Sequence, residues 1–284
     1  MSLADRGAPI RQLQPPPEDD VTARGQAQQP LVAFLEEQYA RYNRRELAAG
    51  DPVSFLYRYQ DPLDREVAGL MAALLAYGRL ATIVRAVADM LGRLGDEPRR
   101  FLLGAGDAHL ERACRGFVHR RWDASSMCRL LAGTRRILRE SGSLEAAFRV
   151  NVSPDDRSVV RALEGFVAQL SGSPSGMGHL LPTPRRGSAC KRLFLFLRWM
   201  VRRDEVDPGG WSCVRPAQLV VPLDVHMHRV CTALGLTRRR QADLRAALEI
   251  TDAFRCLRPD DPVRYDFALM HLSAERGMAA FNVA

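Results

Sequence analysis

An aspartate and two histidines directly follow an apolar run in the segment VVPLDVHMHRV, residues 220–230. Asp224 precedes residues with the apolar spacing of a helix, which predicts that its side chain caps that helix. A capping carboxylate is held rigidly and kept ionised by backbone N–H groups. Such a group can also stabilise a developing cation or take a proton from an amine, so Asp224 is a candidate catalytic residue as well as a cap.

The two histidines, His226 and His228, are only two positions apart. On a helix they point in different directions, whereas a metal pair needs a spacing of about four residues, so we expect no metal site here. His226 lies in the first helical turn and can direct its ring at a phosphate together with the N–H groups of that turn. His228 is expected on the surface.

Lys191 is the only lysine in the chain, against 40 arginines. Arginine stays protonated, whereas a desolvated lysine can lose its proton and act as a nucleophile. Lys191 opens the apolar segment KRLFLFLRWMV, where a helix start and the loss of hydration both favour the uncharged amine. Two alternatives stay open: an accident of a GC-rich coding background, and a lysine whose stem follows the edge of a buried helix while its charge stays in water.

The elements that must position these residues are helices. Apolar residues recur at helical spacing along most of the chain after residue 30, and no run shows the alternation of a β-strand. The predicted fold class is all-α. Helices are expected at residues 31–47, 61–95 with a break at 77–79, 107–121, 125–140, 143–150, 155–171, 190–203, 225–234, 238–249 and 261–276.

Three segments fall outside the expected helices. Residues 1–30 contain QPPPEDD and GQAQQP and few large apolar residues, which predicts a disordered arm. Residues 171–187 are rich in glycine, serine and proline and predict a long loop or hairpin before the lysine helix. Residues 204–219 predict a second loop.

The composition indicates the class of partner and the cellular environment of the protein. The net charge of +8 favours a polyanionic partner, although arginines on a solvated face give the same sum. The six cysteines are far apart with no CxxC pair, which argues against a zinc or iron–sulfur site. The N-terminus lacks the pattern of a signal peptide and no apolar run is long enough to cross a membrane, so we expect a cytoplasmic protein.

Two segments resemble the helix-hairpin-helix DNA glycosylases, in the branch that removes 8-oxoguanine. VPLDVHM, residues 221–227, is very close to the segment that bears the catalytic aspartate of that superfamily. GSACKRLFLFL, residues 187–197, is similar to its lysine helix. From residue 31 onward the chain also resembles a bacterial family without an assigned function, through DPLDREVAGLMAALLAYGR, LFLRWMVRRDEVDPGGW and PLDVHMHRV.

The superfamily resemblance implies a two-lobed helical fold with the active site in the cleft between the lobes. One helical lobe would comprise residues 31–75 and 192–284. The central lobe would comprise residues 76–191 and end in the hairpin and the start of the lysine helix.

The resemblance also implies roles for three residues. Lys191 would attack the anomeric carbon of a damaged nucleoside and form a Schiff base, while Asp224 would stabilise the sugar cation and shuttle protons. His226 would contact a DNA phosphate. The target base would be flipped out of the duplex, and β-elimination from the Schiff base would nick the strand.

The expected hairpin departs from the pattern of the superfamily. The turn there usually carries Gly-hydrophobic-Gly, whose amides hold a phosphate, often with a monovalent cation, but LPTPRRGSAC has a single glycine. We therefore expect no cofactor, and a monovalent cation at the hairpin is left open. Arg185, Arg186, Gly187 and Ser188 are expected to grip phosphate.

Base and duplex recognition are assigned to five further residues. At the break after the buried helix, Arg79 is expected to fill the space left by the flipped base and Tyr77 to stack. In RYDFALMHL, Asp266 is expected to accept from a base N–H and Phe267 to stack. Trp211, in the second loop, is a further candidate to stack on a base. Ordinary packing or surface exposure is the alternative for each of them.

The leading interpretation is a DNA glycosylase with AP lyase activity that excises an oxidised purine such as 8-oxoguanine from double-stranded DNA. We expect a monomer associated with the nucleoid. A non-catalytic protein of the same fold that binds DNA lesions or structures is the alternative, and an unrelated basic helical protein is the third. Lys191 and Asp224 in one pocket would favour the enzyme, whereas an exposed, isolated Lys191 would favour the third.

Overall fold

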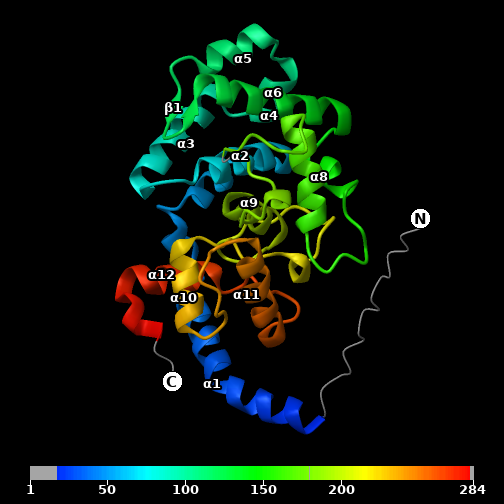
Figure 1. Ribbon diagram of the computed structural model, residues 1–284. Helices are drawn as coiled ribbons and strands as arrows, with labels where there is room; N and C mark the ends of the chain where they lie inside the picture. Colours follow the sequence, from blue (N-terminus) through cyan, green and yellow to red (C-terminus); the bar gives the residue numbers. More distant parts are fainter. Residues whose placement is uncertain (1–17, 179, 282–284) are drawn as a thin grey trace, which may run out of the picture.

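The computed structural model describes residues 18–178 and 180–281, with side chains from residue 29 onward (Figure 1). This part of the chain is helical almost throughout, which confirms the all-α prediction. Within it the sheet structure consists of one antiparallel pair of two-residue strands, β1 (Val118–His119) and β2 (Trp122–Asp123). The absence of any longer strand agrees with the lack of β-alternation in the sequence.

The helices of the first part of the chain lead up to the predicted hairpin. They are α1 (Glu18–Tyr42), the 3-10 helices η1 (Arg45–Ala48) and η2 (Pro52–Arg58), α2 (Pro62–Leu75), α3 (Leu80–Leu94), α4 (Pro98–Gly104), α5 (Asp107–Cys114), α6 (Ala124–Ser141), α7 (Leu144–Arg149) and α8 (Val160–Ser171).

The remaining helices follow the hairpin and carry most of the candidate site residues. They are η3 (Pro184–Arg186), α9 (Lys191–Val201), η4 (Pro216–Gln218), α10 (Val225–Ala233), α11 (Leu244–Leu257), α12 (Asp266–Arg276) and η5 (Met278–Phe281).

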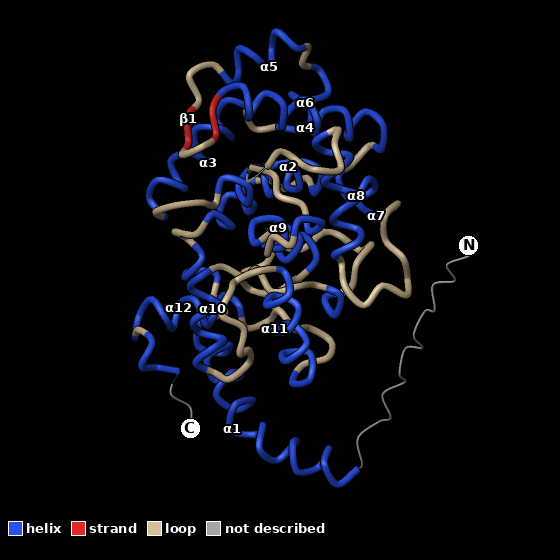
Figure 2. The backbone as a smooth tube through the Cα atoms, in the orientation of Figure 1, coloured by secondary structure: helices blue, strands red, loops and turns tan. Residues whose placement is uncertain are grey.

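Helices α2 and α9 form the centre of the fold. Figures 1 and 2 show them between α3–α6 on one side and α1 with α10–α12 on the other. Their sequences, PLDREVAGLMAALL and KRLFLFLRWMV, are apolar almost all round, as helices buried on every side require. The two helices approach closely, because a Cβ added at Gly69 of α2 would lie 3.0 Å from the Cε of Met200 in α9.

The apolar core runs without interruption through this centre. Buried side chains of α2, α3, α6, α8, α9, α10, α11 and α12 belong to one contiguous cluster. At one end, the first helix meets the last ones: Tyr42 of α1 donates a hydrogen bond of 2.6 Å to Glu275 of α12. The core therefore continues across the boundaries at residues 75 and 191, and the division into two lobes stays a prediction.

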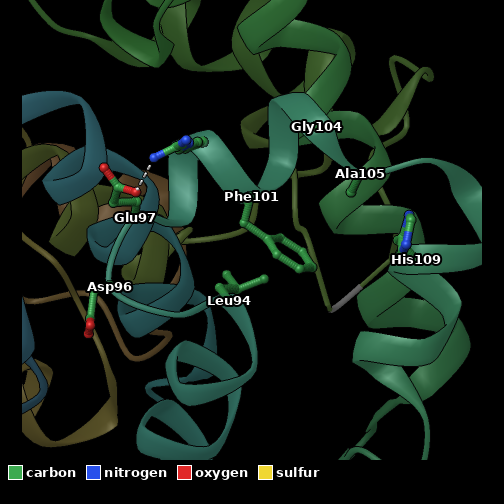
Figure 3. Close-up of a pocket in the computed structure, with 8 residues that line it drawn as sticks. Leu94, Asp96, Glu97, Phe101, Gly104, Ala105 and His109 are labelled. Carbon is green, nitrogen blue, oxygen red and sulfur yellow. Dashed lines mark hydrogen bonds and ion pairs between the residues drawn. The ribbon is translucent and has the colours of Figure 1, made fainter.

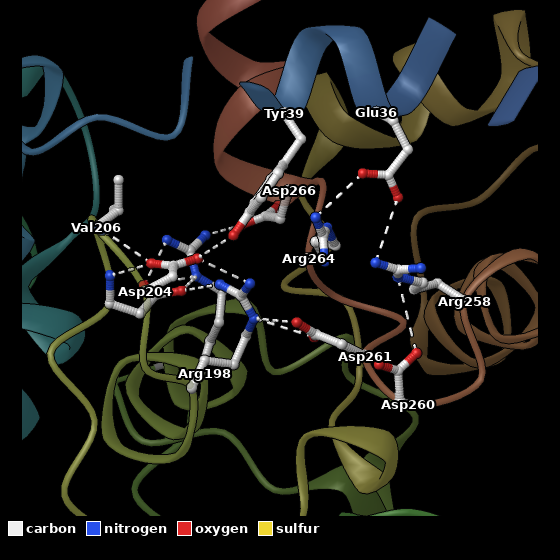
Figure 4. Close-up of polar contacts among 12 residues, drawn as sticks. Glu36, Tyr39, Arg198, Asp204, Val206, Arg258, Asp260, Asp261, Arg264 and Asp266 are labelled. Atoms are coloured by element: carbon white, nitrogen blue, oxygen red, sulfur yellow. Dashed lines mark hydrogen bonds and ion pairs between the residues drawn. The ribbon is translucent and has the colours of Figure 1, made fainter. Parts of the chain in front are cut away.

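A buried network of charges anchors α9 (Figure 4). The side chains of Arg198 and Arg202 are 3% and 5% exposed. Their carboxylate partners are Asp204, Asp207, Asp261 and Asp266. Tyr39 of α1 joins the network by donating a hydrogen bond of 3.0 Å to Asp204. A buried charge is costly unless it is paired. The network therefore requires the segment after α9 and the segment before α12 to pack against α9.

Several expected boundaries differ from the structure. The expected helices 31–47, 155–171 and 261–276 are shorter, since α1 ends at Tyr42 and α8 and α12 begin at Val160 and Asp266. Residues 18–30, expected in a disordered arm, belong to α1; the rest of the expected arm, residues 1–17, lies outside the described residues. The expected helix 107–121 ends at Cys114, because Gly116, with φ of 70°, turns the chain toward β1. The expected helix 238–249 becomes α11, because Asp243 caps it through the N–H of Ala246.

Packing of α6 on α8 gives a stability test with a matched control. A Cβ at Gly133 in α6 would lie 1.9 Å from the carbonyl oxygen of Leu170, a backbone atom that cannot rotate away. We expect Gly133→Ala to lower the free energy of unfolding by about 1–3 kcal/mol.

The control is Gly92→Ala in the exposed face of α3, where an added Cβ meets nothing within 4 Å. That change is expected to raise the free energy of unfolding by about 0.5–1 kcal/mol, because alanine favours helix over glycine. Urea denaturation of both variants measures the two effects. Equal effects of the two substitutions would contradict the close approach of α6 and α8.

Candidate active site

Lys191 and Asp224 meet at the starts of two helices. Lys191 is the first residue of α9, and Asp224 immediately precedes α10. The ammonium nitrogen Nζ of Lys191 lies 2.8 Å from Oδ2 of Asp224, and the two side chains are 36% and 31% exposed. The structure thus brings the two candidate catalytic residues together at a partly accessible place.

Asp224 caps α10, as its position in the sequence predicts. Its Oδ1 accepts hydrogen bonds from the N–H groups of His226 (2.9 Å) and Met227 (2.8 Å), which leaves Oδ2 for Lys191. Burial opposes ionisation of this carboxyl group, but the charge and hydrogen bond of Lys191 and the two N–H donors outweigh it and lower its pKa. Asp224 is therefore a carboxylate at neutral pH.

The backbone just before Lys191 is strained. Cys190 has φ of 45° and ψ of 33°, a left-handed conformation that residues other than glycine rarely adopt. Its N–H donates to Oγ of Ser188 at 3.2 Å, and its side chain is buried. Such conformations persist where the surrounding structure imposes them, and they gather at functional sites. Here the conformation sets the direction in which α9, and with it Lys191, begins.

An open cavity of about 640 Å³ lies on one side of the Lys191–Asp224 pair. It is lined by the loop between α2 and α3, by the end of the hairpin and by the start of α10. The predicted site residues on its wall are Tyr77, Gly187, Ser188, Lys191, Asp224 and His226. Residues from three predicted segments therefore share one cavity.

A smaller pocket of about 140 Å³ lies on the other side of the same pair. Asp266 and Phe267, at the start of α12, line it together with Lys191 and Asp224. The wall also includes Asp51, Arg198 and Trp199, which the sequence did not single out. The signal of Asp51 was its place before a proline, where it caps η2. Arg198 and Trp199 belong to α9 and carry no separate signal.

Burial raises the pKa values of the two other carboxyl groups of the small pocket, Asp51 and Asp266. Burial raises the pKa of Asp266, although its ion pair with Arg198 opposes the rise. Burial also raises the pKa of Asp51, against the N–H of Val53, which donates to its Oδ1 at 2.9 Å. One carboxylate oxygen of Asp266 already accepts from Arg198. Asp266 therefore has less capacity to accept from a base N–H than the sequence suggested.

The histidine rings have partners within the protein. Nε2 of His226 lies 3.1 Å from Oγ of Ser273 in α12, and its backbone N–H is used by Asp224. Nε2 of His228 lies 2.9 Å from the carbonyl oxygen of Arg239, so this side chain is half-buried instead of exposed. The N–H groups of His226 and Met227 are therefore not free for a phosphate.

The loop between α2 and α3 presents an exposed aromatic ring at the open cavity. Tyr77 is 53% exposed, and the guanidinium groups of Arg120 and Arg192 lie 5.7 and 5.9 Å from the centre of its ring. Glycine is favoured at position 78 because its φ of 118° is a conformation that residues with a side chain rarely adopt. Arg79 is exposed but does not line either cavity beside Lys191.

The hairpin residues divide between the cavity and the surface. Gly187 and Ser188 line the open cavity, whereas Arg185 and Arg186 are exposed outside its wall. Nε of Arg185 lies 3.4 Å from Oε2 of Glu164. The N–H of Gly187 donates to Pro184, so the amide of the turn's glycine is already bound.

Trp211 does not line the predicted base pocket. Its side chain is buried, its Nε1 donates to Oε2 of Glu66 at 3.0 Å, and its ring packs on Phe148 and Phe196. The expectation of stacking on a base is corrected here to packing in the core. The loop tryptophan serves the fold because the second loop folds back over α7 and α9.

Another open pocket, of about 490 Å³, lies away from this site beside α4 (Figure 3). Its wall includes Leu94, Phe101 and His109, together with the ion pair of Arg100 and Glu97. Neither Lys191 nor Asp224 borders it. The two cavities that flank the Lys191–Asp224 pair are therefore the better candidates for chemistry.

The sequence of most of the chain matches a known protein family. The model described as "Protein of unknown function (DUF2400)" matches residues 51–275. The chain belongs to the DUF2400 family. Every residue that lines the two cavities beside Lys191 falls inside the DUF2400 match. Comparison with the curated proteins and with the solved structures found no match.

The described part of the chain was expected to hold neither a metal site nor a membrane span. Among residues 18–178 and 180–281, no group of three or more histidine, cysteine or acidic side chains is placed to hold a metal ion. No helix in this described part of the DUF2400 chain is long and apolar enough to cross a membrane.

The cap of α10 gives a pH-dependent prediction. Asp224→Ala is expected to lower the free energy of unfolding by about 1 kcal/mol at pH 7, because it removes the acceptor of two N–H groups. Asp224→Asn keeps a capping oxygen and is expected to cost less.

The sign of the pH dependence follows from the lowered pKa of Asp224. Stabilisation by the ionised group is present above the pKa of the unfolded chain, near 3.8, and is lost as the pH falls through the lower folded value. The stability gap between the natural chain and Asp224→Asn should therefore narrow as the pH is lowered from 5 toward 3. Urea denaturation along this series measures it, and a gap that widens toward low pH would contradict the assignment.

Proposed function

We propose that this protein is a DNA glycosylase with AP lyase activity that excises an oxidised purine such as 8-oxoguanine. The observation that carries the proposal is the pairing of the only lysine with a capping aspartate, between an open cavity and a small pocket. A nucleoside removed from a duplex needs this arrangement: room for the strand, a pocket for the base, and the reacting groups between them.

Chemistry at the pair begins with a proton transfer. Lys191 and Asp224 form an ion pair, so a proton must leave Nζ before it can attack, and Asp224 is placed to accept it. The amine then attacks C1′ while the bond from C1′ to the base breaks, and the base leaves with the electron pair and takes up a proton. Asp224 passes the proton that it took from Nζ to the departing base and, as a carboxylate again, stabilises the positive charge that develops on the sugar.

The covalent adduct then leads to strand cleavage. The adduct loses a proton from nitrogen, O4′ gains one, and the C1′–O4′ bond opens to leave a Schiff base. Loss of the C2′ proton and cleavage of the bond between C3′ and its oxygen release the 3′ phosphate, which is the lyase step. Water finally hydrolyses the Schiff base and frees Lys191.

The surroundings of the pair suit a polyanion. The net charge is +8, and Arg186 and Arg79 present exposed side chains on the two segments that flank the open cavity. These charges support DNA binding in general and do not by themselves distinguish an enzyme from a protein that only binds lesions.

Reductive trapping tests the proposal directly. The protein is mixed with duplexes that contain 8-oxoguanine, other damaged bases or an abasic site, and borohydride is added to reduce any Schiff base. We expect a covalent protein–DNA adduct with the oxidised purine and with the abasic site. Apart from the N-terminal amine, the chain has one primary amine that could form it.

Two substitutions serve as controls. Lys191→Arg keeps the charge beside Asp224 but cannot form the Schiff base, so its adduct should vanish while DNA binding persists. Asp224→Asn should slow base release about 10²- to 10⁴-fold, the range of a proton-transferring group. Tight binding to lesions with neither an adduct nor base release would instead support the non-catalytic lesion-binding protein.

A further inference from the structure

The small pocket beside Lys191 has a polar lining that suits one class of base. Besides Lys191 and Asp224, its wall includes the carboxyl groups of Asp51 and Asp266 and the aromatic rings of Phe267 and Trp199. These residues come from the segment before η2, from α9 and from the start of α12. An aromatic wall with two carboxyl groups offers stacking and hydrogen-bond acceptors to a flat ring that carries N–H donors.

Asp51 has hydrogen-bonding capacity left over. Its Oδ1 caps η2 by accepting from Val53, but Oδ2 has no hydrogen-bond partner in the described part of the chain. Asp266 differs, because one of its oxygens is bound to the buried Arg198. Asp51 is half-buried on the pocket wall, so its Oδ2 can accept from a bound base that donates N–H groups.

Trp199 adds an unused donor to the same wall. Its side chain is 0% exposed, and its indole Nε1 has no hydrogen-bond partner among the residues that the structure describes. Unsatisfied buried donors are rare in folded proteins and call for an explanation. Asp51 thus offers an acceptor, and Trp199 an aromatic side chain, on the wall of one pocket.

We infer that Asp51 is a specificity-determining residue that selects guanine-type bases by accepting hydrogen bonds from N1–H and the N2 amino group. Guanine and its 8-oxo form present these two adjacent donors, and a carboxylate matches them with two oxygens or with one shared between them. Adenine-type bases present an acceptor at N1 instead, which a carboxylate repels. The inference rests on the proposed glycosylase function and names the base class for that site.

The test combines one substitution with one change in the base. Asp51→Asn keeps the shape and the capping oxygen but loses the charge. Single-turnover base release is measured for the natural chain and for this variant, on duplexes with 8-oxoguanine or 8-oxohypoxanthine, which lacks the N2 amino group. We expect each change alone to slow release about 10- to 100-fold, the range of a bidentate contact to a base. The two changes combined should slow base release by much less than the product of their separate effects, since both remove the same contact.

Asp61→Asn is the matched control. Asp61 also precedes a proline and also caps a helix, through the N–H of Leu63 at 2.8 Å, but it lies on the surface away from both cavities. Asp61→Asn should change the free energy of unfolding as much as Asp51→Asn does. Its rate of base release should stay that of the natural chain. Borohydride trapping at an abasic site needs Lys191 but no base, so it should stay within about twofold for all three proteins.

The outcomes separate this inference from the proposed function. Equal loss of trapping and of base release in Asp51→Asn, or fully independent effects of the two changes, would overturn the role of Asp51 while leaving the glycosylase intact. Release of 8-oxoadenine as fast as 8-oxoguanine by the natural chain would do the same. Absence of both trapping and base release in the natural chain would remove the proposed function and this inference with it.

Discussion

The buried positive charges of Arg198 and Arg202 are the constraint on which the rest of the structure depends. An ion of this kind, placed in the interior without a partner, costs several kcal/mol, so folding has to deliver carboxylates to both. Asp207 comes from the turn directly after α9, whereas Asp261 and Asp266 come from the segment that leads into α12. These ion pairs hold the segment before α12 against α9. They thereby fix α9 between the two ends of the molecule.

With its C-terminal end anchored, α9 can tolerate unfavourable features at its start. Cys190 takes a left-handed conformation, and a lysine occupies the first position, where the positive end of a helix disfavours it by about 0.3–1 kcal/mol. The carboxylate of Asp224, 2.8 Å from Nζ, offsets this cost, because a hydrogen bond between charged groups contributes about 1.5–3 kcal/mol.

The sequence predicts the local features of this protein better than its long-range contacts. Helical spacing identified the all-α class, and the Pro-Leu-Asp order identified Asp224 as a cap, since both depend on neighbouring residues. The contact of Arg198 with Asp266 could not be predicted, because the two residues lie far apart in the chain. For the same reason the sequence did not single out Asp51, which the fold carries to the wall of a pocket beside Lys191. Trp211 was assigned to base stacking because its buried partner, Glu66, is distant in sequence.

The charges around the reacting pair also determine how a nucleotide could be oriented. In the small pocket, Lys191 pairs with Asp224 and Arg198 pairs with Asp266, which leaves Oδ2 of Asp51 as an acceptor for a base with N–H donors. The open cavity lies next to the hairpin and is flanked by the exposed side chain of Arg186. Under the proposed function, the open side therefore suits a phosphate and the inner side a base. Because Lys191 and Asp224 border both cavities, the sugar between base and phosphate would then be the part of the nucleotide that lies against Nζ.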